Sequence, residues 1–257
     1  MIGIGITTRN RPNILYACLA HFMAFLPKDA MFVIIDDASD DWYKNQAIVD
    51  RVNNDYENNC KVIYKYNKER LGISGSKNAC LSTLKHCEHI FLFDDDCFPR
   101  CPGWESNWIT AGFDHLAYSV DTSSRGNHLK PTGKKKNTIL EFSGVLGCML
   151  YLSQNALKKV GWFDPKFGLY GYEHAQYTKR CHLAGLSPFL YSVPDFAKQT
   201  IYSLDMDYGW FGEKTPIEIE LDYTKFGSSV TKAEADLHHK YAHLMNTNEI
   251  YIPEVAL

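Results

Sequence analysis

Three consecutive aspartates, Asp94, Asp95 and Asp96, are the residues of this sequence best suited to carry out chemistry. They follow His89–Phe93, a short apolar segment of the kind expected for a buried strand. On an extended backbone, residues two apart face the same side, so we expect Asp94 and Asp96 to converge and Asp95 to point away. Mg²⁺ and Mn²⁺ prefer oxygen ligands and keep positions open for phosphate. The triplet therefore predicts a cation site that binds phosphate; the alternative, an acidic turn in water, leaves three like charges crowded together.

A second acidic pair, Asp36 and Asp37, ends the apolar segment Met31–Ile35. A carboxylate at this position can accept the N–H of a nucleobase. The alternative is that Asp37 and Ser39 only cap the helix that follows, since both residue types are common helix caps. Taken alone, the pair does not decide between these two interpretations.

The elements that must position these residues alternate between strands and helices. We expect strands over Ile2–Thr7, Met31–Ile35, Lys61–Tyr66 and His89–Phe93, with helices between them over Asn13–Phe25, a polar stretch ending at Val52, and Ile73–Leu84. This order predicts an α/β fold with a Rossmann-like, mainly parallel central sheet flanked by helices. Ligands of such sheets bind outside the carboxyl ends of the strands, which is where the polar residues of this chain gather.

The pattern is less regular beyond Pro102. The expected elements are a helix, a strand, a strand-like stretch and two further helices, over Trp104–Phe113, Leu116–Val120, Ile139–Leu152, Ser153–Val160 and Glu173–Ala184. Because no repeat or linker is visible, we expect a single domain over residues 1–257. Residues 1–100 would form its nucleotide-binding half, and residues 101–257 its acceptor-binding half and C-terminal tail.

Residues Ser123–Asn137 are polar, basic and glycine-containing, which predicts a loop. Arg125 and the run Lys134–Lys136 would let this loop close over a diphosphate or an acceptor. The alternative is an ordinary solvated loop.

Composition and charge exclude several classes of protein. With 45% hydrophobic residues the chain can build a full core, and a formal net charge of −3 creates no field that recruits nucleic acid or an anionic membrane. No apolar run approaches the roughly 20 residues that span a bilayer, and the N-terminus has no cationic leader. Eight cysteines without a CxxC pair predict free thiols rather than a zinc or disulfide framework. We therefore expect a cytoplasmic protein.

Five segments of the chain together resemble a known family. They are Val33–Asp40, Gly72–Ala79, Phe91–Asp96, Gly161–Phe167 and Tyr170–His174, and they span about residues 2–190 in the family's order. The first three resemble family 2 glycosyltransferases with the GT-A fold. The last two resemble the acceptor-side segment of that family, and the related galactosyltransferase and polypeptide N-acetylgalactosaminyltransferase group.

The resemblance implies a fold, an activity and a cofactor. The fold would be GT-A with an acceptor-side extension. The enzyme, of the hexosyltransferase class, would use Mn²⁺ or Mg²⁺ to move a sugar from a nucleotide-diphosphate sugar, with a UDP-sugar favoured, to an acceptor hydroxyl. The sequence does not identify the acceptor, which can be a polysaccharide, another glycan, a protein or a modified nucleic acid.

The resemblance also implies which residues bind the donor. Asp96 would bind the metal directly, Asp94 the metal or the ribose, and Lys77 would replace a family arginine that lies near the base or the diphosphate. Gly171 would let the backbone approach the donor sugar. Trp162 is an aromatic contact for a hexose, or else core packing. The full set of expected nucleotide-sugar contacts is Thr7, Arg9, Asp37, Lys77, Asp94, Asp95, Trp162 and Gly171.

The expected catalytic pair is Glu173 and His174. Inverting members of the family usually carry Glu-Asp here, with the aspartate as catalytic base. In this chain Glu173 inherits that role, or His174 acts as the base, or the enzyme is a retaining one that needs no such base; we rank Glu173 first. Glu173 can instead hold the sugar's hydroxyls, or simply be a carboxylate at a helix N-terminus that pairs with Arg180.

The sequence also offers candidates for a third metal ligand and two alternative functions. His238, His239 and His243 are candidates for a third metal ligand, but Lys232–Leu244 also fits an ordinary amphipathic helix. A sugar nucleotidylyltransferase is disfavoured because the segment after the first strand has no glycine with which to wrap a triphosphate. A non-catalytic nucleotide-sugar-binding module is the stronger rival, since the usual aspartate is replaced at His174.

Overall fold

The computed structural model describes residues 1–56, 60–121, 129–204 and 251. Its centre is a six-stranded sheet in the order β3-β2-β1-β4-β9-β6. The strands are β1 (Ile2–Thr8), β2 (Ala30–Asp36), β3 (Val62–Tyr66), β4 (His89–Asp94), β6 (His115–Ala117) and β9 (Met149–Ser153). Strands β1 to β4 are parallel to one another, and β9 is antiparallel to both β4 and β6. The predicted mainly parallel α/β sheet is confirmed.

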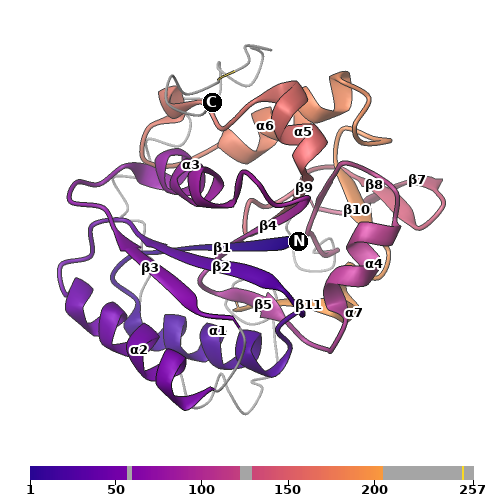
Figure 1. Cartoon of the computed structure of the whole chain (residues 1–257). Coiled ribbons are helices and arrows are strands. Elements are labelled where there is room, and N and C mark those ends of the chain that lie inside the picture. Colours follow the sequence, from indigo (N-terminus) through magenta and orange to yellow (C-terminus); the bar gives the residue numbers. More distant parts are fainter. Residues whose placement is uncertain (57–59, 122–128, 205–250, 252–257) are drawn as a thin grey trace.

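Helices cover both faces of this sheet (Figure 1). On one face lie α1 (Pro12–Ala24) and α2 (Trp42–Asp55); on the other lie α3 (Gly72–Leu84), α5 (Gln154–Val160) and α6 (Glu173–Leu183). Ser153 caps α5 by accepting the backbone N–H of Ala156. Strands β1, β2 and β4 are buried on both faces, and their sequences are therefore mostly apolar, whereas β3 at the sheet edge is largely exposed.

A glycine in β1 allows α3 to approach the sheet closely. A Cβ added to Gly5 would lie 2.8 Å from Cβ of Cys80, a separation at which one of the two elements would have to move. The close contact fixes α3 against β1, and so fixes the side chains that α3 directs toward the strand ends.

The remaining elements build the second half of the chain. They are β5 (Cys97–Pro99), α4 (Trp104–Thr110), β7 (Pro131–Lys136), β8 (Ile139–Phe142), a 3₁₀ helix over Pro165–Phe167, β10 (Ser192–Pro194), α7 (Ala197–Thr200) and β11 (Ile201–Ser203). Strands β10, β8 and β7 form a three-stranded sheet, and β11 pairs with β5.

Two predictions about this half are wrong. The expected loop over 123–137 contains β7, an edge strand that pairs with β8; its backbone bonds require no apolar side chains, and lysines are common at exposed edges. The expected single stretch Ile139–Leu152 is two strands in different sheets. Arg125 lies outside the described residues.

The order of the strands creates a crevice at one end of the sheet. The chain runs from β1 outward through β2 to β3, and then returns to place β4 on the other side of β1. Ligands of open α/β sheets bind at such a reversal, outside the carboxyl ends of the strands. Thr7, near the end of β1, is paired in register with Asp94, the last residue of β4.

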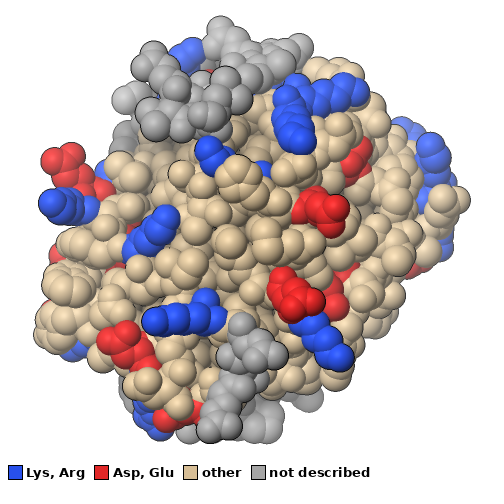
Figure 2. Space-filling model, in the orientation of Figure 1, with Lys and Arg blue, Asp and Glu red and all other residues tan. Residues whose placement is uncertain are grey.

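Charge is distributed evenly over the face seen in Figure 2, where basic and acidic side chains are interspersed and neither kind gathers in a patch. This agrees with the near-neutral net charge. All eight cysteines are free thiols, as expected. Within the described ranges, no helix has the length and apolarity needed to cross a bilayer.

A buried histidine gives the fold a pH dependence. His115 is fully buried between Tyr151 O, 2.9 Å from Nδ1, and Thr178 Oγ1, 3.0 Å from Nε2. Burial lowers the pKa of His115 from 6.5 to about 4. The unfolded chain therefore takes up a proton at a higher pH than the folded one, so the stabilisation is complete above pH 6.5 and is lost as the pH falls toward 4.

We predict that the unfolding free energy of the wild-type protein falls by about 3 kcal/mol more than that of His115→Gln between pH 6.5 and 4. Urea unfolding at a series of pH values measures both curves. Parallel curves would show that His115 is not buried in its neutral form.

Candidate active site

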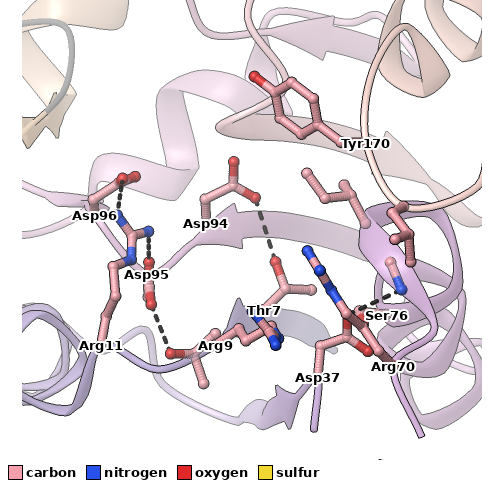
Figure 3. Close-up of a pocket in the computed structure, with 14 residues that line it drawn as sticks. Thr7, Arg9, Arg11, Asp37, Arg70, Ser76, Asp94, Asp95, Asp96 and Tyr170 are labelled. Carbon is pink, nitrogen blue, oxygen red and sulfur yellow. Dashed lines mark hydrogen bonds and ion pairs between the residues drawn. The ribbon is translucent and has the colours of Figure 1, made fainter. Parts of the chain in front are cut away.

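A cavity opens at the carboxyl ends of β1, β2 and β4 (Figure 3). We call it the first cavity. The predicted site residues that line it are Thr7, Arg9, Asp37, Asp94, Asp95 and Asp96. Residues that the sequence placed far apart thus meet at the crevice expected from the sheet topology.

A second cavity adjoins the first. The predicted residues that line it are Lys77, Asp94, Gly171, Glu173 and His174. The two cavities share Ile73, Asp94 and Tyr170 in their walls. Asp94 therefore separates Thr7, Arg9 and Asp37 from the predicted catalytic pair, and the predicted donor residues Lys77 and Gly171 lie on the side of that pair.

The three aspartates do not point as expected. Strand β4 ends at Asp94 and the backbone turns at Asp95 and Asp96, so the rule for extended residues fails there. Asp94 points into the cavity below Tyr170, and its side chain is 28% exposed. The other two carboxylates face Arg11 (Figure 3).

Arg11 holds the turn with both ends of its guanidinium group. Its Nη1 donates to Oδ2 of Asp96 over 3.0 Å, and its Nη2 donates to Oδ1 of Asp95. The other oxygen of Asp95 accepts the hydroxyl of Thr8 over 2.6 Å. Thr8, Arg11, Asp95 and Asp96 are all buried. Burial raises the pKa of Asp95 to about 7, although the positive charge of Arg11 acts to lower it. Arg11 was not identified from the sequence, although it lies only two residues after the predicted Arg9.

The two carboxylates of the second acidic pair have different environments. Asp36 is fully buried and accepts hydrogen bonds from Ser39 N, from Asn45 Nδ2 over 2.7 Å and from the hydroxyl of Tyr64 over 2.6 Å. It is a structural residue that ties β2 to β3 and α2. Helix α2 starts at Trp42 without a side-chain cap, so the prediction that Asp37 and Ser39 cap it is wrong.

Asp37 lies in the wall of the first cavity and fixes the start of α3. Its Oδ1 accepts Leu71 N over 2.7 Å and Asn67 Nδ2 over 3.2 Å, and its Oδ2 accepts Gly72 N over 2.9 Å. Because a carboxylate oxygen can accept two hydrogen bonds, Oδ2 can accept a nucleobase N–H together with that of Gly72.

Arg70 is a second cavity residue that sequence reasoning missed. It lies close to Arg9 and Asp37 in the first cavity (Figure 3). Burial and the like charge of Arg9 lower the pKa of Arg70, while Asp37 opposes them. Two guanidinium groups at one wall suit an anion such as a phosphate. The signal was available, because Arg70 lies in the polar segment after β3, a strand end like the others.

Lys77 lies in a different place from the one predicted. It is buried on α3, it lines the second cavity rather than the first, and three oxygen atoms surround its ammonium group. Nζ donates to Gly147 O over 2.7 Å and is 3.7 Å from Oδ1 of Asp94 and 3.6 Å from Oε1 of Glu173. Burial disfavours the charged form, but the two carboxylates outweigh it and raise the pKa of Lys77. Its ammonium group thus lies between Asp94, which borders both cavities, and Glu173, which borders the second.

Glu173 is the first residue of α6 and is buried between two nitrogen donors. Oε1 lies 3.6 Å from Lys77 Nζ and 3.2 Å from Nδ1 of His174. Burial favours the neutral acid, but His174 and then Lys77 outweigh it and lower the pKa of Glu173 to about 2. The expected pairing with Arg180 is wrong, because that guanidinium group donates to Gln176, Val160 O and Trp162 O.

The segment before α6, residues 168–171, lies against the start of α3 at Gly72. Gly171 has a φ of 107°, which favours glycine. A Cβ on Gly72 would lie 2.5 Å from Gly168 O, so these two segments approach closely. Trp162 is buried and lines neither cavity.

The first cavity offers few ligands for a metal ion. Across residues 1–56, 60–121 and 129–204, no three His, Cys, Asp or Glu side chains are grouped to hold one. Asp94 is the open carboxylate, whereas Asp96 is already bonded to Arg11. Oxygen donors in this number suit a hard cation that takes its other ligands from substrate phosphate and water. His238, His239 and His243 lie outside the described residues.

The sequence of this region matches a known family. Residues 4–106 match the profile described as Glycosyl transferase family 2. The chain is also 25% identical, over 207 residues, to the uncharacterized glycosyltransferase R363 of Acanthamoeba polyphaga mimivirus, a match that covers 75% of this chain and 77% of that protein.

Solved structures share the fold. TarS of S. aureus superposes with a TM-score of 0.58 at 15% identity, over 91% of this chain and 41% of TarS. GalNAc-T7, solved with UDP, GalNAc and Mn²⁺, superposes with a TM-score of 0.59 at 12% identity, over 96% of this chain and 51% of that protein. This chain thus spans about half or less of the length of these two proteins.

These similarities confirm the resemblance read from the sequence. Residues 4–106 match the model of family 2 glycosyltransferases, the fold is GT-A, and the enzyme class is that of the glycosyltransferases.

We predict that Arg11→Gln lowers the unfolding free energy by about 3 kcal/mol, because it leaves buried carboxylates without their counter-ion. Urea unfolding measures the loss. Arg51→Gln is the matched control, since Arg51 forms an exposed pair with Asp55 and its loss should leave the unfolding midpoint unchanged. Equal effects of the two substitutions would show that Arg11 does not hold the acidic turn.

Proposed function

We propose that this glycosyltransferase moves a sugar from a nucleotide-diphosphate sugar, with a UDP-sugar favoured, to a hydroxyl group of an acceptor. One observation carries the proposal: Asp94 stands in the wall of both cavities, with Asp37 on one side and Glu173 on the other. A donor that spans this wall would have its nucleotide in the first cavity and its sugar toward the second. GalNAc-T7, which shares the fold, was solved with UDP, GalNAc and Mn²⁺.

The first cavity suits the nucleotide diphosphate. Asp37 Oδ2 would accept a base N–H, and Arg9 and Arg70 would neutralise phosphate charge. Thr7 donates to Asp94 over 3.3 Å and so orients the carboxylate nearest to the diphosphate. On this proposal residues 1–100 form the donor half, and the later residues supply the acceptor side.

Asp94 and Asp96 would hold Mn²⁺ or Mg²⁺. A bound divalent cation supplies Lewis-acid stabilisation of the departing diphosphate. Burial raises the pKa of Asp94 against the opposing charge of Lys77, and Asp96 and Glu173 raise it further, so a bound cation would stabilise the ionised carboxylate. Asp96 faces Arg11, so its part in metal binding requires that contact to open.

Transfer would take place at the boundary between the cavities. The acceptor oxygen forms a bond to the sugar's anomeric carbon while the bond from that carbon to the diphosphate oxygen breaks. In an inverting reaction the hydroxyl proton passes to a base, for which Glu173 and His174 are the candidates. Alternatively Glu173 holds sugar hydroxyls, and a retaining reaction uses no such base.

A non-catalytic nucleotide-sugar-binding module is the alternative. Such a module would bind UDP-sugars in the first cavity but would release no UDP. Incubation of the wild-type protein with a panel of UDP-sugars and Mn²⁺, with detection of free UDP, separates the two. Donor binding without UDP release, in the presence of varied acceptors, would support the module.

We predict that Asp94→Asn weakens Mn²⁺-dependent binding of UDP about 10- to 100-fold, because one charged contact is lost. Calorimetric titration with and without Mn²⁺ measures the affinity. Asp50→Asn, an exposed carboxylate on α2, is the matched control and should bind as the wild type does. Unchanged affinity in Asp94→Asn would place the metal or the nucleotide elsewhere.

We further predict that Glu173→Gln binds UDP normally and loses transfer by about 10²- to 10⁴-fold in kcat if Glu173 is the base. Steady-state kinetics with the donor identified by UDP release provide the measurement. A rise in KM with little change in kcat would instead identify Glu173 as a residue that holds sugar hydroxyls.

A further inference from the structure

The ring of His174 borders the second cavity, yet both of its nitrogens are directed at oxygen atoms of the protein. Nδ1 lies 3.2 Å from Oε1 of Glu173, and Nε2 lies 3.2 Å from Val145 O. An ionised carboxylate and a backbone carbonyl can only accept hydrogen bonds. Both contacts are therefore hydrogen bonds only when each ring nitrogen carries a hydrogen. A ring in that state has no lone pair left to take a proton from an acceptor hydroxyl.

Packing holds the ring in this orientation. A Cβ added to Gly147 would lie 2.9 Å from Cγ and from Nδ1 of His174, so the ring lies directly against the backbone at that glycine. The carbonyl of the same Gly147 accepts the ammonium group of Lys77 over 2.7 Å. The backbone of residues 145–147 thus fixes both side chains that contact Glu173.

Lys77 and His174 approach the same oxygen of Glu173, whose carboxylate also accepts a hydrogen bond from its own backbone N–H. Lys77 Nζ and His174 Nδ1 both approach Oε1, at 3.6 Å and 3.2 Å. If Glu173 acts as a base, the other oxygen, Oε2, is the one that would meet a hydroxyl in the cavity.

From this geometry we propose that His174 is a positioning residue. By hydrogen-bonding to both Glu173 and Val145 O, it holds Glu173 in a fixed orientation in which Oε2 is directed toward the acceptor. The inference rests on the proposed glycosyl transfer and decides between its two candidate bases. The proton of the acceptor hydroxyl passes to Oε2 of Glu173 as the acceptor oxygen bonds to the anomeric carbon and the diphosphate departs. The histidine in the Glu-His pair thus orients the glutamate rather than replacing the usual aspartate as base.

The test compares His174→Asn with His174→Leu. Asparagine keeps an N–H near the position of Nδ1 but has no basic nitrogen, whereas leucine fills space without any donor. We expect His174→Asn to keep kcat within about tenfold of the wild type, with KM for the donor unchanged, and His174→Leu to lose clearly more kcat. A loss of about 10²- to 10⁴-fold in both variants would identify His174 as the base and overturn the proposal.

Two controls test whether the effects of the His174 substitutions are specific to that position and are not caused by misfolding. His182→Asn, on the same helix, removes a ring whose Nδ1 lies 3.3 Å from Ser187 O, and it should leave kcat unchanged. Calorimetric UDP binding and thermal melting of every variant separate a misfolded protein from an inactive one. A wild-type protein that transfers no sugar would overturn the proposed function, whereas transfer by the wild type with equal loss in both His174 variants would overturn only the role of His174.

A measurement without turnover examines the contact itself. In protein labelled with ¹⁵N in its histidine rings, with His174→Asn used to assign the signal, NMR shows which ring nitrogens carry hydrogen. We expect both nitrogens of His174 to carry hydrogen wherever the contacts with Glu173 and Val145 O are made. A bare Nε2 would mean that the contact with Val145 O is not a hydrogen bond, and would overturn the proposal whatever the activity.

Discussion

Three consecutive carboxylates lie at the end of a buried strand, and their negative charges must be neutralised for the site to keep its shape. Two basic side chains from different parts of the chain neutralise them. Arg11, at the start of α1, bonds to Asp95 and Asp96, while Lys77, on α3, lies 3.7 Å from Asp94. Helices on opposite faces of the sheet are thereby tied to one turn. Like charges in a poorly solvated place would otherwise repel one another or take up protons.

The same arrangement joins two cavities into one site. Lys77 lies beside Asp94, which borders both cavities, and beside Glu173, which borders the second, and its ammonium group donates to Gly147 O. On the proposed function, a change in charge at the diphosphate would act on Glu173 through this buried ammonium group. The leaving group and the candidate base would then belong to one electrostatic network.

Much of this site could be predicted from sequence, and the failures have physical causes. The strands and the acidic triplet stood out because buried parallel strands read as apolar runs and end in polar residues. The partners of the triplet did not, because Arg11 and Asp96 are 85 residues apart and no local pattern pairs them. The directions of Asp95 and Asp96 were missed because the backbone turns directly after β4. The position of Lys77 in the second cavity was not foreseen, because its burial depends on how closely α3 packs at Gly5, which its residue type does not reveal.

The proposed function requires the first cavity to hold a nucleoside diphosphate whose phosphates lie at Asp94. A crystal structure of the protein with UDP and Mn²⁺ would locate both. We expect the base beside Asp37, the phosphates between Asp94 and the pair Arg9 and Arg70, and the cation on Asp94. UDP bound at any other surface, with the first cavity empty, would overturn the proposed donor site.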